Sequence, residues 1–419
     1  MTLPCYYALG GINFKNGFVT SCPQQSDQLV ILDQEYLPSR FFNSESFKQH
    51  RRDLMSGVWP SGCDMCQRVE CANSGRSMRQ EEPVKLNHYH ADGSVDFEGL
   101  RTAEIRFSHS CNMSCLHCSQ VFSSGWMSKL KRYQSDSEDR QHQLHQLTGA
   151  MHRKSPDDDL TMSISTERAL EIVEDLNRNF PRLERVDFAG GEVLYQKQFF
   201  PTLEKLSEHP NARRMLVMFH TNFNADFDPI RLSNLLQKFG LSRIMISVDA
   251  GPRLYPYFRQ GDWQKLKSNI EAFRSVNKKT EVNLVCTTGV YQIMEIKDIF
   301  EGFLTLDANH IDSSIIFTPD YLNPALMMLH YKEQTLQDIA KTKDYISNFR
   351  VSNIRESAKT SAVQALKNIE TYITNHKAEE KHWEAFKVYI RKSDSIWKQN
   401  FNDHIHNYKF VDGEIIRNV

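Results

Sequence analysis

The 419-residue sequence contains no run of about 18 consecutive apolar residues, which is the minimum length of a candidate membrane-spanning helix. Its first residues also lack the charged and then apolar pattern of a secretory signal peptide. Net charge is nearly absent, because 51 Lys and Arg residues are balanced by 52 Asp and Glu residues. These absences argue against a membrane span and against a global basic field for nucleic acid. We expect a cytoplasmic protein whose partners are neither membranes nor nucleic acids.

Cysteine is scarce, with nine residues in the whole chain. Five of them occur within the first 71 residues, three lie close together near position 115, and Cys286 stands alone in a strand-like segment. We interpret Cys286 as a small buried apolar side chain. Because the cytosol keeps thiols reduced, the two clustered groups indicate metal ligands rather than a disulfide framework.

The central group is Cys111, Cys115 and Cys118, separated by three and two residues, just after the strand-like segment 103–107. A short loop can direct three thiolates at one soft metal centre. Iron–sulfur clusters usually take four thiolates, so three from one loop leave one iron with an open position. A zinc site that takes a distant fourth ligand, and three cysteines that merely pack, are the alternatives.

The stretch from Cys111 to Cys118 resembles the CxxxCxxC signature of radical S-adenosylmethionine (SAM) enzymes. The resemblance implies a 4Fe–4S cluster whose open iron binds the amino and carboxylate groups of SAM. It also implies an external reductant such as flavodoxin or ferredoxin, and a 5′-deoxyadenosyl radical that takes a hydrogen atom from the substrate. His117 occupies a position that is usually aromatic in the family, which implies a place near the adenine.

Strands and helices alternate from about residue 101, a pattern that favours βαβ units and a parallel sheet. The predicted strands span 103–107, 185–189, 215–220, 243–248, 282–286 and 311–317. The predicted helices between them include 168–177, 200–206, 230–239 and 263–275. Six such repeats fit the partial (β/α)6 TIM-like barrel that the radical SAM resemblance implies. Active sites in such barrels lie at the C-terminal ends of the strands.

Gly190, Gly191 and Glu192 follow the second predicted strand. Two glycines allow the backbone to approach a ligand closely, although a plain strand-to-helix turn would also explain them. Placed after the three-cysteine loop, they resemble the family's GGE motif, which implies that they bind the SAM ammonium group.

The resemblance extends to later strand ends. It implies that Asn222 contacts the ribose or carboxylate of SAM, and that Ser247 and Asp249 hold ribose hydroxyls. Arg259, in a segment similar to a Tyr/Arg/Gly element of relatives, would contact the SAM carboxylate or the substrate. Helix capping is the alternative for the first three residues, and a surface position is the alternative for Arg259.

The N-terminal cysteines form a second group. Asn16-Gly17 favours a hairpin turn that brings Cys5 and Cys22 to one end, and Cys63 and Cys66 are separated by two residues. Four thiolates would make a closed site that accepts either a 4Fe–4S cluster or zinc.

Cys5, Gly17 and Cys22 match the CX9–15GX4C element of SPASM and twitch domains, which hold auxiliary iron–sulfur clusters. The resemblance therefore implies an auxiliary 4Fe–4S cluster held by Cys5, Cys22, Cys63 and Cys66, here placed before the barrel. Cys71 is an alternative fourth ligand. Arg76 or Arg79 would either neutralise the cluster charge or lie at the solvated surface.

We predict three parts: a twitch-like domain over 1–100, a radical SAM barrel over 101–325, and a C-terminal helical region over 326–419.

Segment 128–160 is a polar insertion, either mobile or a lid, whose histidines we interpret as surface residues. Ser46 is expected to cap a helix over 47–56, and helical stripes occur at 362–373 and after Trp383. Strands are expected to stop after about residue 325.

The predicted function is that of a radical SAM enzyme which modifies a peptide or protein side chain. Radical oxidation or rearrangement of a carbohydrate- or nucleotide-derived small molecule is the alternative. A non-enzymatic alternative is a zinc-binding module in which both cysteine groups hold zinc.

Overall fold

The structure is a computed structural model that describes residues 2–15, 18–25, 30–31, 37–71, 77–80, 83–84, 86–119, 122–135, 163–349 and 355–418. It divides into two compact units. The first comprises Met1–His109, Asp159–His220 and Ile230–Arg243; the second comprises Ser110–Asp158, Thr221–Pro229 and Ile244–Val419. Each unit is assembled from separated stretches of the chain.

The first unit is built on a sheet with the strand order β3-β2-β1-β4-β5-β6. Strands β1, β4, β5 and β6 are parallel, and β2 and β3 extend the sheet in antiparallel fashion. The bounds are β1 Gly11–Lys15, β2 Phe18–Thr20, β3 Val30–Ile31, β4 Thr102–Arg106, β5 Arg185–Ala189 and β6 Leu216–Thr221. The predicted hairpin between the first two strands is confirmed, while its turn at Asn16-Gly17 lies outside the described residues.

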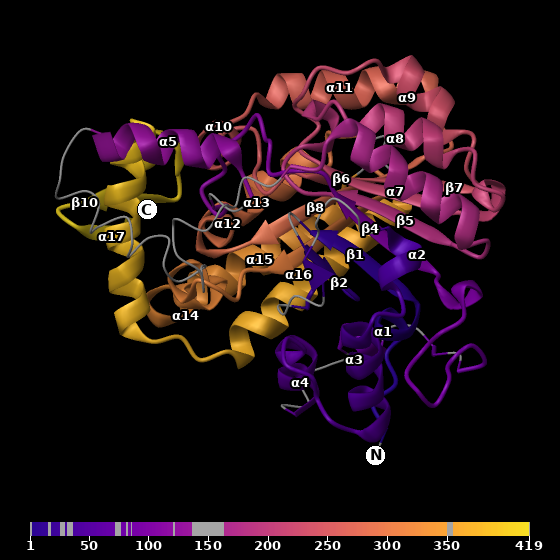
Figure 1. Cartoon of the computed structure of the whole chain (residues 1–419). Helices are drawn as coiled ribbons and strands as arrows, with labels where there is room; N and C mark the ends of the chain where they lie inside the picture. Colours follow the sequence, from indigo (N-terminus) through magenta and orange to yellow (C-terminus); the bar gives the residue numbers. More distant parts are fainter. Residues whose placement is uncertain are drawn as a thin grey trace. The chain divides into compact units, whose positions relative to one another are not determined.

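One face of this sheet carries the apolar core of the first unit. The register places Phe14 beside Ile105, Ile105 beside Phe188, and Phe188 beside Phe219. Phe199 of helix α8 contacts the rings of Phe188 and Phe219 at centroid distances of 5.5 and 5.1 Å. Helices α7 (Thr166–Asn179) and α8 (Phe199–Leu206) pack side by side (Figure 1). Period-two alternation of apolar residues therefore turns one sheet face toward these helices.

Four helices occur among the N-terminal residues: α1 Tyr6–Gly10, α2 Pro38–Phe41, α3 Glu45–Ser56 and α4 Asp64–Cys71. The residues after Cys5 form helix α1, and the chain becomes a strand only at Gly11. One sequence prediction is wrong here. Helix α3 is preceded by Ser44 at the N-cap, not by Ser46, so that Glu45 lies in the first turn, where a negative charge favours the helix dipole.

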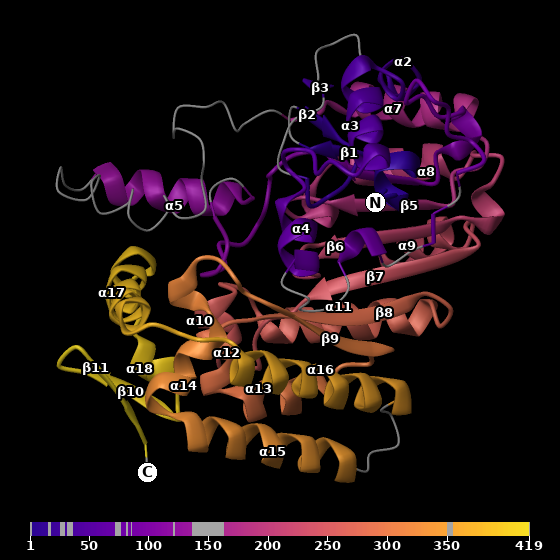
Figure 2. The same cartoon turned by 90° about the horizontal axis from the view of Figure 1, so that it is seen from below.

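The second unit contains β8 (Glu281–Thr288) and β9 (His310–Ile315), which are parallel neighbours. Helix α16 packs on β9, and α15 packs on α16 and α13 (Figure 2). The helices of this unit are α5 Ser124–Ser135, α10 Tyr255–Phe258, α11 Trp263–Val276, α12 Val290–Met294, α13 Ile296–Phe303, α14 Met327–His330, α15 Lys332–Asn348, α16 Glu356–Asn375, α17 Glu380–Trp397 and α18 Phe401–His404.

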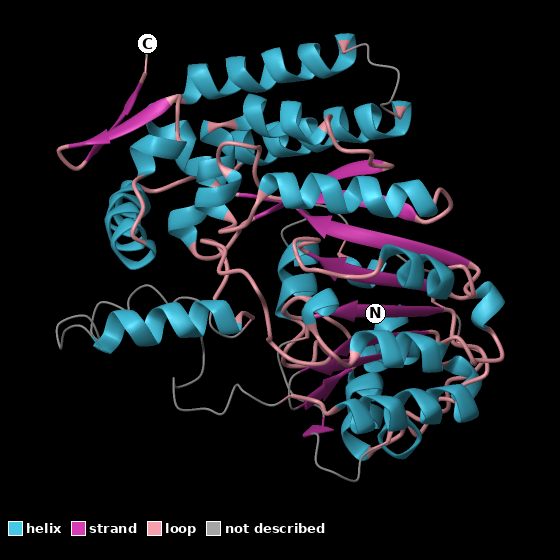
Figure 3. Cartoon of the chain, turned by 90° about the horizontal axis from the view of Figure 1, so that it is seen from above, coloured by secondary structure: helices cyan, strands magenta, loops and turns pink. Residues whose placement is uncertain are grey.

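The six predicted barrel strands are confirmed as β4 to β9, including β7 (Leu241–Ser247), whose residues are divided between the two units. The predicted helices correspond to α7, α8, α9 (Pro229–Leu236) and α11. The α/β class and the helical C-terminal region are thus confirmed. The expectation that strands stop after residue 325 is wrong, because β10 (Tyr408–Val411) and β11 (Glu414–Arg417) form a short antiparallel hairpin (Figure 3). None of the described helices combines the length and apolarity that crossing a membrane requires.

Candidate functional site

The three-cysteine loop lies in the second unit. Its backbone folds back on itself, because the amide of Cys118 donates to the carbonyl of Cys115 at 2.9 Å. Burial raises the pKa of the Cys115 thiol; Arg259 opposes this shift, and Cys118 and Cys111 add to it. Burial likewise raises the pKa of Cys118 to about 12, with Cys111 as the largest further contribution. The three thiols are therefore close enough to influence one another, and a bound cation would relieve the cost of their ionisation.

Asn222 lies beside this loop, one residue after the end of β6. Its Nδ2 donates to Oδ1 of Asn112 at 2.8 Å and lies 3.9 Å from Sγ of Cys111. Its Oδ1 accepts from the amide of Asn224 at 2.8 Å, and Asn112 Nδ2 donates to the Asn224 carbonyl at 3.2 Å. Asn222 and the cysteine loop are thus joined by a network of amide side chains within the second unit.

Arg259 and Asp249 form a buried ion pair in the same unit, with Nη1 and Oδ2 2.5 Å apart. Burial by itself lowers the pKa of Arg259, but Cys115 and Asp249 outweigh it, so that the net shift is upward. The carbonyl of Arg259 lies 3.4 Å from Sγ of Cys115. The surface alternative for Arg259 is therefore wrong, since only 5% of the residue is exposed.

His117 stacks on Phe258, with centroids 5.0 Å apart and planes 7° from parallel. Its Nε2 lies 3.5 Å from Oδ2 of Asp249. Burial lowers the pKa of His117, Asp249 opposes this shift, and Arg259 reinforces it. The stacking on Phe258 and the proximity of Asp249 fix the orientation of the imidazole.

Three buried polar atoms near the cysteine loop have no hydrogen-bond partner among the described residues: Nδ1 of His117, Oγ of Ser119 and Nε of Arg259. Buried polar atoms are normally paired, so such a group fits a polar ligand. Three soft thiols fit an iron–sulfur cluster with an open iron. Within the described part of the chain, no three His, Cys, Asp or Glu side chains stand close enough to coordinate one metal ion, so the assignment depends on the chemistry of these donors.

The GGE turn lies in the first unit, directly after β5. Gly190 and Gly191 have φ values of 86° and 55°, a conformation that suits glycine. A Cβ at Gly190 would lie 3.1 Å from Cβ of Arg106, so the turn packs closely on β4. Glu192 is fully buried, and its Oε1 accepts from the amide of Leu194 at 3.1 Å. Ser247, the remaining predicted SAM contact, is the last residue of β7.

The second face of the first unit's sheet is charged, which the sequence interpretation missed. The register places Glu104 between Asn13 and Asp187. Arg106 donates to Glu104 at 2.6 Å, and Arg185 pairs with Asp187 at 2.7 Å. The sequence contains a signal for this face, since charged and apolar residues alternate along both β4 and β5. This face offers paired charges of both signs.

Lys15 of β1 and His220 of β6 carry perturbed pKa values on the strands that flank β4 and β5. Burial, followed by Arg106, lowers the pKa of Lys15 to about 8, against the opposing effects of Cys22 and Glu104. Burial also lowers the pKa of His220, and Glu104 opposes that shift. Both side chains are thus electrostatically coupled to the Glu104–Arg106 pair.

The four N-terminal cysteines of the predicted auxiliary site line one pocket in the first unit, together with Trp59, Met65, Met78 and Arg79: Cys5, Cys22, Cys63 and Cys66. Burial is the largest contribution that raises the pKa of the Cys5 thiol. Burial is also the largest contribution for Cys22 and Cys63, whose pKa values rise to about 12. Cys71, the last residue of α4, is exposed and does not line this pocket. The four predicted ligands therefore line the same pocket, and Cys71 is not among its lining residues.

Arg79 is part of the four-cysteine pocket rather than of the solvated surface. It forms a bidentate pair with Glu70, and its Nη1 donates to the Pro4 carbonyl at 2.9 Å. Its side chain is 12% exposed. Because Glu70 lies on α4 with Cys66, and Pro4 precedes Cys5, this arginine connects two of the segments that supply the cysteines. Arg76 and Gly17 lie outside the described residues.

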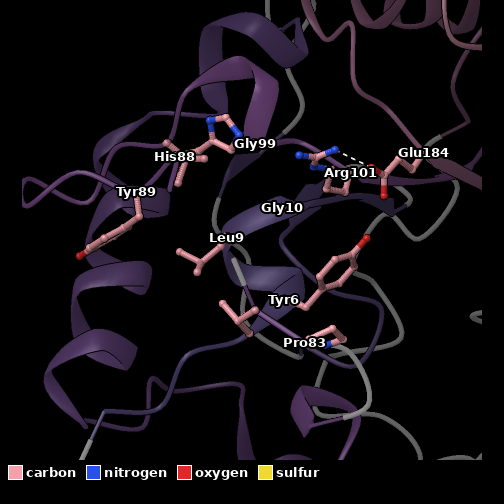
Figure 4. A pocket seen from close by; sticks show the side chains of 11 residues that line it. Tyr6, Leu9, Gly10, Pro83, His88, Tyr89, Gly99, Arg101 and Glu184 are labelled. Carbon is pink, nitrogen blue, oxygen red and sulfur yellow. Dashed lines mark hydrogen bonds and ion pairs between the residues drawn. The ribbon is translucent and has the colours of Figure 1, made fainter. Parts of the chain in front are cut away.

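The first unit also contains a separate pocket beside α1 (Figure 4). Tyr6, Leu9 and Gly10 line it from the helix, and Arg101 and Glu184 form an ion pair of 2.5 Å at its edge. Its charged groups are already paired with each other, and nothing in the sequence interpretation pointed to it.

The predicted insertion over 128–160 is described only in its first residues, which continue helix α5 to Ser135. Its three histidines, His142, His145 and His152, lie outside the described residues. The mobile and lid interpretations of this segment therefore stay predictions.

Comparison with known families gives one match. Residues 105–301 match the family model described as the Radical SAM superfamily. A search of curated proteins gave no match.

Several solved structures are distantly similar. Native anSMEcpe with bound AdoMet has 16% identity and a TM-score of 0.40, over 60% of this chain and 64% of that chain. SuiB from Streptococcus suis bound to the precursor peptide SuiA has 13% identity and a TM-score of 0.35, over 72% and 58%. TYW1 with a lysine–pyruvate adduct has 14% identity and a TM-score of 0.30, over 71% and 87%. The chain therefore spans less than two thirds of the length of the anSMEcpe and SuiB chains.

Proposed function

We propose that this chain, whose residues 105–301 match the Radical SAM superfamily model, is an enzyme of that superfamily that reductively cleaves SAM and takes a hydrogen atom from a substrate. One observation carries the proposal. The loop of Cys111, Cys115 and Cys118 lies with the buried Arg259–Asp249 pair in one compact unit. A family match alone does not name the residues that bind SAM and the cluster, and this arrangement supports the proposed roles of these residues.

In this proposal Cys111, Cys115 and Cys118 hold a 4Fe–4S cluster, which supplies, when bound, the electron that cleaves SAM to a 5′-deoxyadenosyl radical. Arg259 presents a cation for the SAM carboxylate, and its pairing with Asp249 fixes the guanidinium. Asn222 is held by Asn112 and Asn224, so its orientation beside Cys111 is set before SAM binds.

The remaining SAM contacts are proposed from the family resemblance. His117, oriented by Phe258, presents a flat face for the adenine. Ser247 and Asp249 are proposed to hold ribose hydroxyls. Gly190, Gly191 and Glu192 are proposed to bind the ammonium group, because the positive φ of both glycines turns backbone groups toward a ligand without an intervening side chain.

The four-cysteine pocket is proposed to hold an auxiliary 4Fe–4S cluster. Support comes from the convergence of Cys5, Cys22, Cys63 and Cys66 on one pocket. Zinc would accept the same donors. The auxiliary group would receive an electron from an oxidised product, relay one inward, or stabilise the fold, since metal binding contributes folding energy in each case.

The proposed substrate is a peptide or protein side chain, and an external reductant such as flavodoxin or ferredoxin is the proposed electron donor. The charged sheet face supports a polar substrate, because Arg106–Glu104 and Arg185–Asp187 offer both donors and acceptors. A carbohydrate- or nucleotide-derived small molecule would use the same chemistry and stays the alternative.

Anaerobic reconstitution tests the cofactor assignment. About eight irons per chain with matching sulfide would support two clusters. Stoichiometric zinc without sulfide would contradict the enzyme proposal and support a zinc-binding module.

The reaction is tested by deuterium transfer. The reduced protein is incubated with SAM and with labelled candidate substrates, and 5′-deoxyadenosine is analysed by mass spectrometry. Label from a peptide supports the proposed substrate class. Label from a free metabolite, and from no peptide, supports the alternative.

A further inference from the structure

Helix α17 of the C-terminal region donates hydrogen bonds to the three-cysteine loop. Trp397 Nε1 donates to both the carbonyl and Oγ of Ser114, at 3.1 Å each. The Tyr389 hydroxyl donates to the carbonyl of Leu116 at 2.5 Å. Both aromatic side chains are buried, at 5% and 3% exposure. The donors and acceptors are 283 and 273 residues apart in the sequence, so only the tertiary structure brings them together.

A third aromatic donor completes the arrangement from helix α5. Trp126 Nε1 donates to the carbonyl of Cys115 at 2.6 Å. Its ring meets that of Trp397 edge to face, with centroids 4.6 Å apart. The carbonyls of residues 114, 115 and 116 therefore each accept a hydrogen bond from a different buried aromatic side chain.

The same helix also supports the segment that carries Phe258 and Arg259. The Tyr257 hydroxyl donates to Oδ1 of Asp394, whose Oδ2 accepts from the amide of Phe401 at 2.8 Å. The loop and this segment are joined directly, since the amide of Leu116 donates to the Phe258 carbonyl at 2.8 Å. Helix α17 thus supports both the cysteine loop and the arginine segment.

We infer that Trp397 and Tyr389 are positioning residues of the radical site, and that the C-terminal helical region is part of its support. This inference rests on the proposed function. The donors hold the loop carbonyls in one orientation, so the thiols keep their geometry when the charge of the bound cluster changes. Because the indole and phenol groups are neutral, they do so without adding charge beside the cluster, and their rings exclude water. Supporting hydrogen bonds and solvent access both tune metal sites.

Trp397→Phe tests the inference, since it removes the donor and keeps an aromatic ring. In the reconstituted full-length protein, we expect 5′-deoxyadenosine formation per SAM-binding cluster to fall about fivefold to tenfold, as loss of one buried hydrogen bond implies. The electron paramagnetic resonance (EPR) signal of the reduced cluster with SAM should change in shape, and its reduction potential should shift. The iron of the four-cysteine site should be unchanged.

Trp383→Phe is the matched control. Trp383 lies on the same helix and is 3% exposed, but its ring contacts are with His330, Tyr331 and Phe386. This variant should lower the melting temperature while the EPR signal and the rate per cluster stay at wild-type values. Tyr389→Phe is the second test variant if Trp397→Phe does not fold, and the same changes are expected from it.

The outcomes separate this inference from the proposed function. If wild-type protein forms 5′-deoxyadenosine and both test variants behave like Trp383→Phe, the inference is overturned and the function stands. If wild-type protein binds iron but forms no 5′-deoxyadenosine, the proposed function fails. The EPR comparison then decides the inference by itself, because a wild-type signal shape in both variants overturns it.

Discussion

The four-cysteine site of the first unit and the three-cysteine loop of the second differ in where their ligands come from and in what holds them. Cys5, Cys22 and the Cys63–Cys66 pair lie in three separate segments, and the Arg79–Glu70 ion pair connects two of these. The three central cysteines lie in one loop, whose carbonyls are held by neutral aromatic donors. A site whose cysteines come from distant segments needs contacts that hold those segments together. A site whose cysteines come from one loop needs contacts that hold the backbone of that loop in one conformation.

The two sites also differ in what they leave open. In the proposed assignment, four thiolates would close the N-terminal site and leave no position for a reacting ligand. Three thiolates would leave one position, and unpartnered polar atoms of His117, Ser119 and Arg259 lie near that loop in the described structure. The proposed number of ligands would thus separate an auxiliary role from a reactive one.

The largest effect on SAM cleavage is expected from Cys115→Ala, and Cys22→Ala is its counterpart at the four-cysteine site. Cys115→Ala removes a ligand of the open site, so 5′-deoxyadenosine formation should stop while about four of roughly eight irons remain. Cys22→Ala should lose the other four irons and keep SAM cleavage. Iron analysis and chromatography of the SAM products check both. A Cys115→Ala protein that cleaves SAM at the wild-type rate would show that the sites are wrongly assigned.

Glu192→Gln should weaken SAM binding and leave both clusters in place. Gln keeps an oxygen acceptor for the Leu194 amide, so the local turn is retained while the charge is lost. Loss of one charge-assisted contact corresponds to an affinity decrease of about tenfold to hundredfold. Equilibrium dialysis of SAM measures this. Glu192→Ala, which also removes the cap, should in addition lower the melting temperature. Unchanged SAM affinity in Glu192→Gln would contradict the ammonium assignment.

Arg79→Gln should affect only the four-cysteine site. It leaves Glu70 without its bidentate partner and the Pro4 carbonyl without its donor, which we expect to cost about 1–3 kcal/mol. A chelator should remove the iron of that site several-fold faster than from the wild type, while SAM cleavage is retained. Arg79→Lys is the control, because it keeps the charge without the planar fork. If Arg79→Lys is as labile as Arg79→Gln, geometry rather than charge holds the site; loss of SAM cleavage in either would contradict the separation of the two sites.

The smallest effect is expected from Cys71→Ser. Cys71 is exposed and outside the four-cysteine pocket, so iron and sulfide content, cluster spectra and SAM cleavage should all equal those of the wild type. Loss of about four irons in this variant would make Cys71 a ligand and would break the assignment of the closed site.

The placement of the charged sheet face and the contacts of the C-terminal helices could not be predicted from the sequence. The alternation in β4 and β5 was visible, but which of the two faces would be packed by α8 depended on the register with neighbouring strands. Helix α17 was correctly predicted as an amphipathic helix, yet its indole and phenol donors gave no sign of their acceptors. Hydrophobic periodicity indicates which side of a helix or strand is apolar. It does not indicate which carbonyl accepts a hydrogen bond from a buried polar side chain.

The sequence by itself determined the order of strands and helices in the barrel region and the approximate position of each strand, because these depend on spacing and on local alternation. The predicted cap at Ser46 is wrong because the helix begins earlier, with Ser44 at its N-cap and Glu45 in its first turn. Only the tertiary structure decided that Arg259 is buried on Asp249, that Arg79 belongs to the four-cysteine pocket, and that Trp397 holds the loop of Cys115. Each of these contacts joins residues whose separation in the chain carries no information about their distance in the fold.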